Sequence, residues 1–156
     1  MLFVVQISEL IRGIVIIISG AFWFESWLMD KSMKILIVDD SSTTRKIEKK
    51  ILNELGFENI CEADDGSTAL PLLENGDIDF VITDWYMQNM QGFDLLVAIR
   101  KNPKLCKVPV MMVTAKVEQE ELVAAAKAGL NGFIVKPFAG DALMAKMQRI
   151  FERMGQ

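Results

Sequence analysis

Two short apolar runs that end in aspartate constrain the fold of this chain more than any other feature. Residues 34–38 lead into Asp39 and Asp40, and residues 80–83 lead into Asp84. Such runs are typical of buried strands in a parallel sheet, where ligands bind beyond the carboxyl ends of the strands. If the two strands are neighbours, three carboxylates meet at one edge. A hard cation with oxygen ligands relieves their repulsion, so the pattern predicts a Mg²⁺ site and chemistry on phosphate.

Length and composition exclude several classes of function. The 156 residues suffice for one well-buried domain and are too few for two ordinary ones. A net charge of −4 argues against nucleic-acid binding driven by overall charge, and the absence of histidine excludes His-based catalysis and His-ligated zinc. Cys61 and Cys106 form no CxxC pair, and we interpret them as two buried thiols in a reducing cytosol.

Residues 1–32 differ from the rest of the chain. Residues 13–24 are strongly apolar and uncharged, but a twelve-residue helix rises only about 18 Å, short of a bilayer core of about 30 Å. No Lys or Arg lies within residues 1–6, which argues against a secretory signal. We expect a dispensable extension or a mis-assigned start, since Met33 could itself begin the protein. A helix packed on the domain or a partner, and a membrane-associated anchor, remain the alternatives. The domain is therefore assigned to residues 33–156.

From Met33 onward the chain alternates between expected strands and expected helices. Strands are predicted at residues 34–38, 59–63, 80–83, 108–113 and 132–135. Helices are predicted after a Ser42 or Thr43 cap up to Gly56, from the turn at 64–66 to 75–76, and at 93–100, 119–128 and about 143–151. This alternation indicates an α/β fold, a doubly wound parallel sheet of five strands flanked by five helices.

Five polar residues come directly after these strands. Thr114 follows the fourth and Lys136 the fifth, so both are expected at the edge that carries Asp39, Asp40 and Asp84. Taken singly, such an aspartate could cap a helix and such a lysine could be solvated. Together they fit an aspartyl nucleophile with Mg²⁺ on one side and a hydroxyl and an ammonium facing incoming phosphoryl oxygens.

The stretches ILIVDD, TDWYMQNMQG, MMVTAK and GFIVKPF, with the turn EADDGSTAL, make residues 33 to about 154 similar to the receiver domains of two-component response regulators. The similarity is greatest to the stand-alone chemotaxis receivers of the CheY type. It implies a flavodoxin-like sheet with strand order 2-1-3-4-5. It also implies that Asp84 accepts the phosphoryl group and that Mg²⁺ is held by Asp39, Asp40, Asp84 and the main-chain carbonyl of Tyr86.

The same resemblance implies a switch. Thr114 would be the switch hydroxyl, Lys136 would pair with the phosphate, and the Lys136–Pro137 bond would be cis. Phe133 would be the aromatic that turns inward when Thr114 moves. The output face would comprise the fourth helix, fifth strand and fifth helix, including Phe133 and Lys146.

We therefore expect a cytoplasmic, monomeric, single-domain response regulator, most similar to those of chemotaxis. It would catalyse only its own phosphorylation and dephosphorylation. The expected partners are a histidine kinase, the flagellar motor switch protein or another output protein, and in some settings a phosphatase, with neither nucleic acid nor membrane among them. No output domain is expected, because the sequence ends two residues after Met154.

Several positions depart from the flagellar pattern: Phe133 replaces Tyr, Gln88 replaces Pro, Tyr86 and Lys116 replace Asn and Glu, and Glu118 and Gln119 replace lysines. Surface drift is one interpretation. The other is a paralogue that no longer suits the acidic motor peptide and instead serves as a phosphate sink or regulates a non-flagellar pathway. Phosphatases of the haloacid-dehalogenase type need a second Asp where Tyr86 stands, and nucleotide hydrolases need a Gly-rich phosphate loop that is absent from the sequence.

Overall fold

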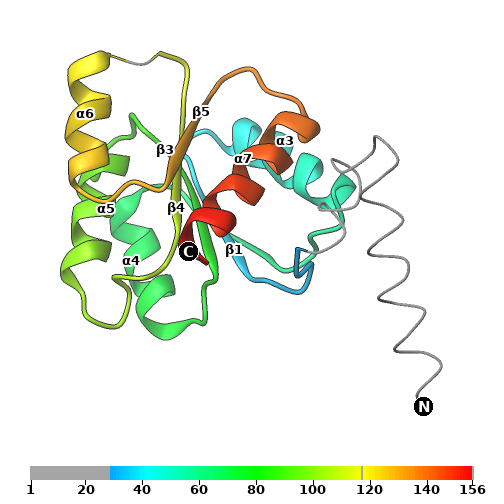
Figure 1. The fold of residues 1–156 in the computed structure, drawn as a ribbon, viewed down its shortest axis with the longest axis horizontal. Coiled ribbons are helices and arrows are strands. Elements are labelled where there is room, and N and C mark those ends of the chain that lie inside the picture. The colour runs from blue at the N-terminus through cyan, green and yellow to red at the C-terminus, as the bar shows by residue number, and fades with distance from the viewer. Residues whose placement is uncertain (1–28, 117, 156) are drawn as a thin grey trace. The chain divides into compact units, whose positions relative to one another are not determined.

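A five-stranded parallel sheet forms the centre of the domain (Figure 1). The computed structural model describes residues 29–116 and 118–155. The chain divides into two compact units, 1–30 and 31–156, and the sheet belongs to the second. Nearly all of the predicted extension, residues 1–28, lies outside the described residues. None of the described helices is long and apolar enough to cross a membrane.

Strands and helices alternate in the predicted order. The strands are β1 (Ile35–Val38), β2 (Ile60–Ala63), β3 (Phe80–Asp84), β4 (Val110–Thr114) and β5 (Gly132–Val135). The helices are α3 (Ser42–Glu54), α4 (Gly66–Asn75), α5 (Gly92–Lys101), α6 (Gln119–Lys127) and α7 (Gly140–Met154). All strand pairs are parallel and the sheet order is β2-β1-β3-β4-β5, which confirms the predicted fold.

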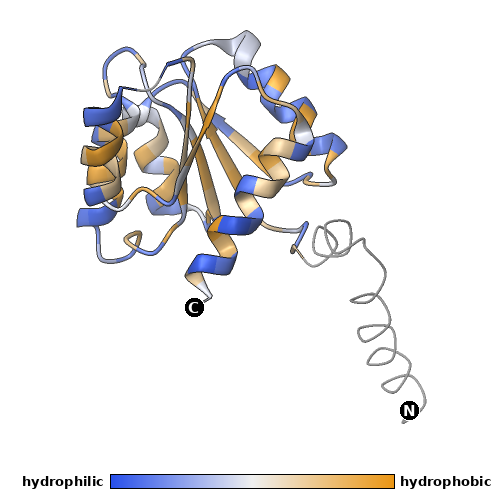
Figure 2. Ribbon diagram, turned by 45° about the horizontal axis from the view of Figure 1, so that its top comes forward, coloured by the Kyte–Doolittle hydropathy of each residue, from blue (hydrophilic) through white to orange (hydrophobic). Residues whose placement is uncertain are grey.

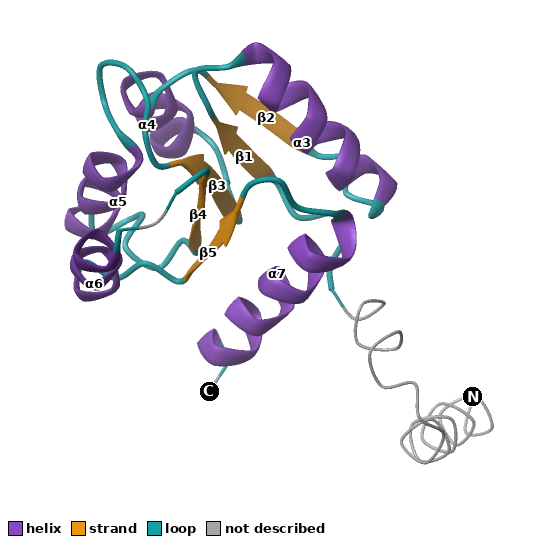
Figure 3. Ribbon diagram, turned by 90° about the horizontal axis from the view of Figure 1, so that it is seen from above, coloured by secondary structure: helices purple, strands orange, loops and turns teal. Residues whose placement is uncertain are grey.

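Helices cover both faces of the sheet, with α3 and α7 on one side and α4, α5 and α6 on the other (Figure 3). Alternate residues of a strand point to opposite faces. Leu36 and Val38 therefore join the core under α4 and α5, whereas Phe80 faces the other side and contacts Phe151 of α7. Figure 2 shows the resulting apolar interior between the polar outer surfaces of the helices. Burial on both faces explains why the strands are continuous apolar runs.

The expectation of two buried thiols is wrong. Cys61 on β2 is only partly buried, and Cys106 is exposed in the segment between α5 and β4.

The observed element ends correct several of the predicted ones. Ser41, rather than Ser42 or Thr43, caps α3, because its hydroxyl accepts the backbone N–H of Thr44. Strand β4 begins two residues later than predicted, at Val110. Pro109 has no N–H to donate, and only its carbonyl takes part, accepting from Val81.

The compact unit begins two residues before the predicted boundary. The Lys31 ammonium lies 4.2 Å from the centre of the Phe57 ring. The Ser32 carbonyl accepts a hydrogen bond from the Asn59 side chain, and Met33 is buried. These contacts attach residues 31–33 to the start of the sheet.

Candidate functional site

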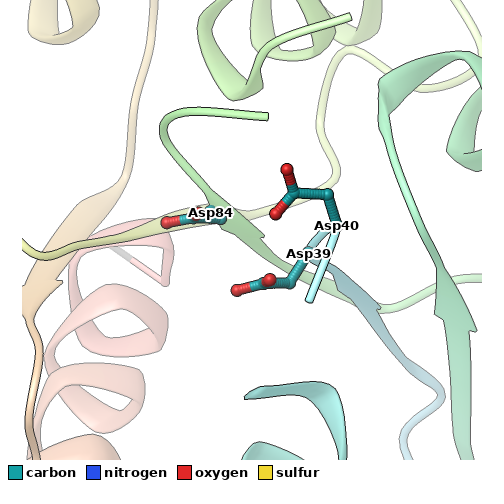
Figure 4. A group of neighbouring side chains, drawn as sticks. All are labelled: Asp39, Asp40 and Asp84. Carbon is teal, nitrogen blue, oxygen red and sulfur yellow. The ribbon is translucent and has the colours of Figure 1, made fainter. Parts of the chain in front are cut away.

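Three carboxylates meet at the carboxyl edge of the sheet, as predicted. Asp39 and Asp40 follow β1, and Asp84 is the last residue of the neighbouring β3 (Figure 4). One carboxylate oxygen from each lies within 4.8 Å of the others. Asp39 is almost fully buried, Asp84 is half-buried and Asp40 is exposed, so the group opens toward solvent on one side.

Three hydrogen bonds hold Asp39 in place. Its Oδ1 accepts the backbone N–H of Ser41 at 2.7 Å, and its Oδ2 accepts from the Lys136 ammonium at 2.8 Å. Its main-chain carbonyl accepts from the Arg45 guanidinium at 2.6 Å. A buried carboxylate needs such partners to remain charged, and they also fix its direction.

Lys136 contacts two of the carboxylates at this edge. Its ammonium is 2.8 Å from Asp39 and 3.4 Å from Asp84. Burial lowers the pKa of Lys136, but the hydrogen bond with Asp39 and the charges of Asp84 and Asp39 outweigh this effect, so the net pKa is raised. The Lys136–Pro137 bond is cis, as the resemblance implied.

The Asp84 carboxylate is unfavourably placed without a further cation. Burial raises its pKa above the usual value, Lys136 opposes that shift, and the charge of Asp39 adds to it. One ammonium therefore does not offset three carboxylates at this edge. A cluster of oxygen ligands with excess negative charge fits Mg²⁺.

Thr114 ends β4 at the same edge and is fully buried. Its hydroxyl donates to the Lys116 carbonyl at 2.5 Å and accepts the Lys116 N–H at 3.2 Å. The hydroxyl is thus bonded to the segment that leads into α6. Asp84 and Thr114 are the final residues of β3 and β4, whereas the sequence analysis placed them directly after those strands.

Close packing shapes the loop after Asp84. The Gly92 N–H donates to the Trp85 carbonyl at 3.0 Å, which brings the start of α5 against the end of β3. A Cβ at Gly92 would lie only 2.2 Å from the Asp84 carbonyl oxygen, so only glycine fits there. The side chain of Asn89 donates to Asp65 at 2.8 Å and ties the middle of the loop to the cap of α4.

Two residues expected on the output face, Phe133 and Lys146, lie side by side. Phe133 on β5 is half-buried against the core, and the Lys146 ammonium of α7 lies 5.3 Å from its ring centre. Glu118 directly precedes α6, makes no capping hydrogen bond with its side chain, and forms an ion pair with Lys116. The face that the sequence assigned to output is thus contiguous on β5 and α7.

One charged residue near the site was missed by the sequence analysis. Glu48 of α3 is only 3% exposed. Burial raises its pKa to about 8, Lys136 opposes this, and the charges of Asp39 and Asp84 add to it. A signal was present, because Glu48 lies four residues before the buried Leu52, on the apolar stripe of the helix.

Comparisons with known proteins relate the chain to receiver domains and to CheY proteins. Residues 35–148 match the response regulator receiver domain family. The chain is 55% identical over 127 residues to the chemotaxis protein CheY-3 of Vibrio cholerae, covering 81% of this chain and 98% of that protein. It is 53% identical over 122 residues to the chemotaxis protein CheY of Pseudomonas aeruginosa, covering 78% and 98%. The solved structure of CheY4 of Vibrio cholerae superposes with a TM-score of 0.71 at 31% identity, covering 76% of this chain and 98% of that one.

Proposed function

Because the chain belongs to the response regulator receiver domain family, we propose that it accepts a phosphoryl group on Asp84 from a histidine kinase and signals through the α6–β5–α7 face. The observation that carries this proposal is the carboxylate group of Asp39, Asp40 and Asp84 with Lys136 between two of its members. The relatives named for chemotaxis support a role in that pathway.

Each residue has a defined task in this reaction. An Asp84 oxygen attacks phosphorus, and the bond from phosphorus to the donor's imidazole nitrogen breaks, with the electron pair leaving on nitrogen. Bound Mg²⁺ would supply positive charge to the phosphoryl oxygens and the attacking carboxylate. Asp39, Asp40, Asp84 and the Tyr86 carbonyl would hold the ion. Lys136 is placed to pair with a phosphoryl oxygen.

Thr114 would transmit the change. Its hydroxyl is bonded to Lys116 and would turn to a phosphoryl oxygen, which moves the start of α6 and lets Phe133 repack. The output partner is the flagellar switch protein or another protein. Glu118 and Gln119 on this face favour a partner less acidic than a motor peptide.

Incubating the protein with Mg²⁺ and either acetyl phosphate or a phosphorylated histidine kinase tests the proposal. We expect one acid-stable, base-labile acyl phosphate per chain, dependent on Mg²⁺. Stoichiometric labelling that persists in excess EDTA, or no labelling by any donor, would contradict it.

Removing either of the first two aspartates is expected to weaken Mg²⁺ binding. Asp39→Ala and Asp40→Ala should each lower the affinity by about 10- to 100-fold, because the ion loses a ligand or a group that orients its waters. Isothermal titration with MgCl₂ measures the change. Asp77→Ala is the matched control, because Asp77 is an exposed carboxylate before β3. Unchanged affinity in both site variants would place the cation elsewhere.

We also propose that residues 33–156 constitute the receiver and that residues 1–32 are dispensable for phosphorylation. A chain that begins at Met33 should label like the full chain, because all the site residues follow Met33. Its stability should be lower by about 1 kcal/mol than that of a chain beginning at Lys31, which keeps the contact with Phe57. Urea unfolding and phosphoryl labelling of both shortened chains provide the measurement. Aggregation of both would show that the apolar segment belongs to the domain.

A further inference from the structure

A hydrogen bond joins the phosphorylation-site loop directly to α6. Tyr86, two residues after Asp84, donates its phenol O–H to a carboxylate oxygen of Glu121 in the first turn of α6. The acceptor is charged, so the bond belongs to the stronger, charge-assisted class. Tyr86 is the only tyrosine in the chain, and its side chain is 44% exposed.

The chain from Thr114 to the first turn of α6 is therefore anchored at two points. Near its start, the Thr114 hydroxyl bonds both the N–H and the carbonyl of Lys116. At its far end, Glu121 is bonded to Tyr86. If Thr114 turns toward a phosphoryl group, the first anchor is released, and α6 can follow only if the second opens as well.

We propose that the Tyr86–Glu121 hydrogen bond is a strap that holds α6 in its unphosphorylated position and opens when Asp84 is phosphorylated. This inference rests on the proposed function. Phosphorylation adds about one negative charge at Asp84, the last residue of β3 and only two residues from Tyr86. The added charge repels the Glu121 carboxylate, so the event that releases Thr114 also disfavours the strap. Tyr86 and Glu121 are then positioning residues that set the balance between the two states.

Binding of beryllofluoride, a mimic of the aspartyl phosphate, tests the strap in the full chain with saturating Mg²⁺. Tyr86→Phe removes only the O–H and keeps the ring and the main-chain carbonyl. Glu121→Ala removes the acceptor. Each variant should bind beryllofluoride about 3- to 10-fold more tightly, as expected when one such hydrogen bond no longer favours the unbound state. The double variant should match the single ones, because all three lose the same bond.

Glu120→Ala is the matched control for charge. Glu120 is exposed in the same turn of α6, and its substitution should change the affinity by less than about twofold. Equal affinities in Tyr86→Phe and the unmodified chain, or equal gains in Glu121→Ala and Glu120→Ala, would overturn the strap. Failure of the unmodified chain to bind beryllofluoride would instead overturn the phospho-acceptor role on which the strap depends.

A second measurement needs no phosphoryl mimic to detect the bond. With tyrosine labelled at Cζ, the chain gives one ¹³C resonance, from Tyr86. Glu121→Ala should move this resonance toward that of a free phenol, and Glu120→Ala should not. Beryllofluoride should move the resonance of the unmodified chain in the same direction. If Glu121→Ala leaves the Tyr86 resonance unchanged, the hydrogen bond does not form. If beryllofluoride leaves it unchanged, the hydrogen bond does not open.

Discussion

Replacing Asp84 by asparagine is expected to reduce phosphoryl labelling to the background of a reaction without protein. The amide has nearly the shape of the carboxylate but lacks its nucleophilic oxygen. The fold should be preserved, because Lys136 keeps its shorter contact with Asp39. Since burial raises the pKa of Asp84, the charged form is disfavoured in the folded state, and the variant should be at least as stable as the parent chain.

Radiolabelled acetyl phosphate with Mg²⁺, followed by gel autoradiography, measures the loss. Asp77→Asn makes the same chemical change at an exposed position before β3 and should label fully. Asp39 and Asp40 are the competing acceptors, since their oxygens lie in the same group. Full labelling of the Asp84 variant would transfer the acceptor role to one of them.

The sheet and its carboxylate edge could be predicted because local pattern and burial agree there. Every residue of β1 is fully buried, which explains why the strand is an apolar run in the sequence. The first charged residue after the run, Asp39, marks the end of the strand. In a parallel sheet all such ends lie on one edge, which placed Asp84 and Lys136 beside Asp39 without knowledge of the structure. Thr114 was placed by the same argument.

The contacts that the loop after β3 makes with the helices could not be predicted in this way. The bonds from Tyr86 to Glu121 and from Asn89 to Asp65 join residues far apart in the chain, and no periodicity relates them. Exposed polar side chains have many possible partners, and only the folded loop selects one. The same limit applies to the Thr114 hydroxyl, whose position at the strand end was predictable but whose bond to Lys116 was not.

Glu48 is a charged residue on the buried side of α3, and the sequence analysis did not recognise it as part of the site. A carboxyl at a buried helix position costs stability when it is charged, and this one lies near the negative charges of Asp39 and Asp84. Its cost must be tolerated or offset by the positive charge of Lys136, which acts in the opposite direction. The balance can be measured by changing the pH.

Glu48→Gln is expected to stabilise the protein above neutral pH and to have little effect at pH 4. Burial raises the pKa of Glu48 from 4.5 to about 8 in the folded state. Below the lower value the carboxyl is protonated in both states, so pH has no effect through this group. Between the two values the unfolded chain releases the proton and the folded chain retains it, so stability falls as pH rises. Glutamine does not titrate and avoids this loss, which should reach about 2–4 kcal/mol at pH 8.

Urea unfolding at a series of pH values in EDTA measures the difference between variant and parent, in which the titrations of all other groups largely cancel. Glu58→Gln, at an exposed position just after α3, is the control and should give a difference near zero throughout. A pH-independent difference for Glu48→Gln would mean that the buried carboxyl titrates normally. Added Mg²⁺ provides a further check, because a cation beside Asp39 and Asp84 favours the charged form of Glu48 and should shrink the stabilisation by glutamine. The proton affinity of the Glu48 carboxyl would then depend on the charge at the phosphorylation site.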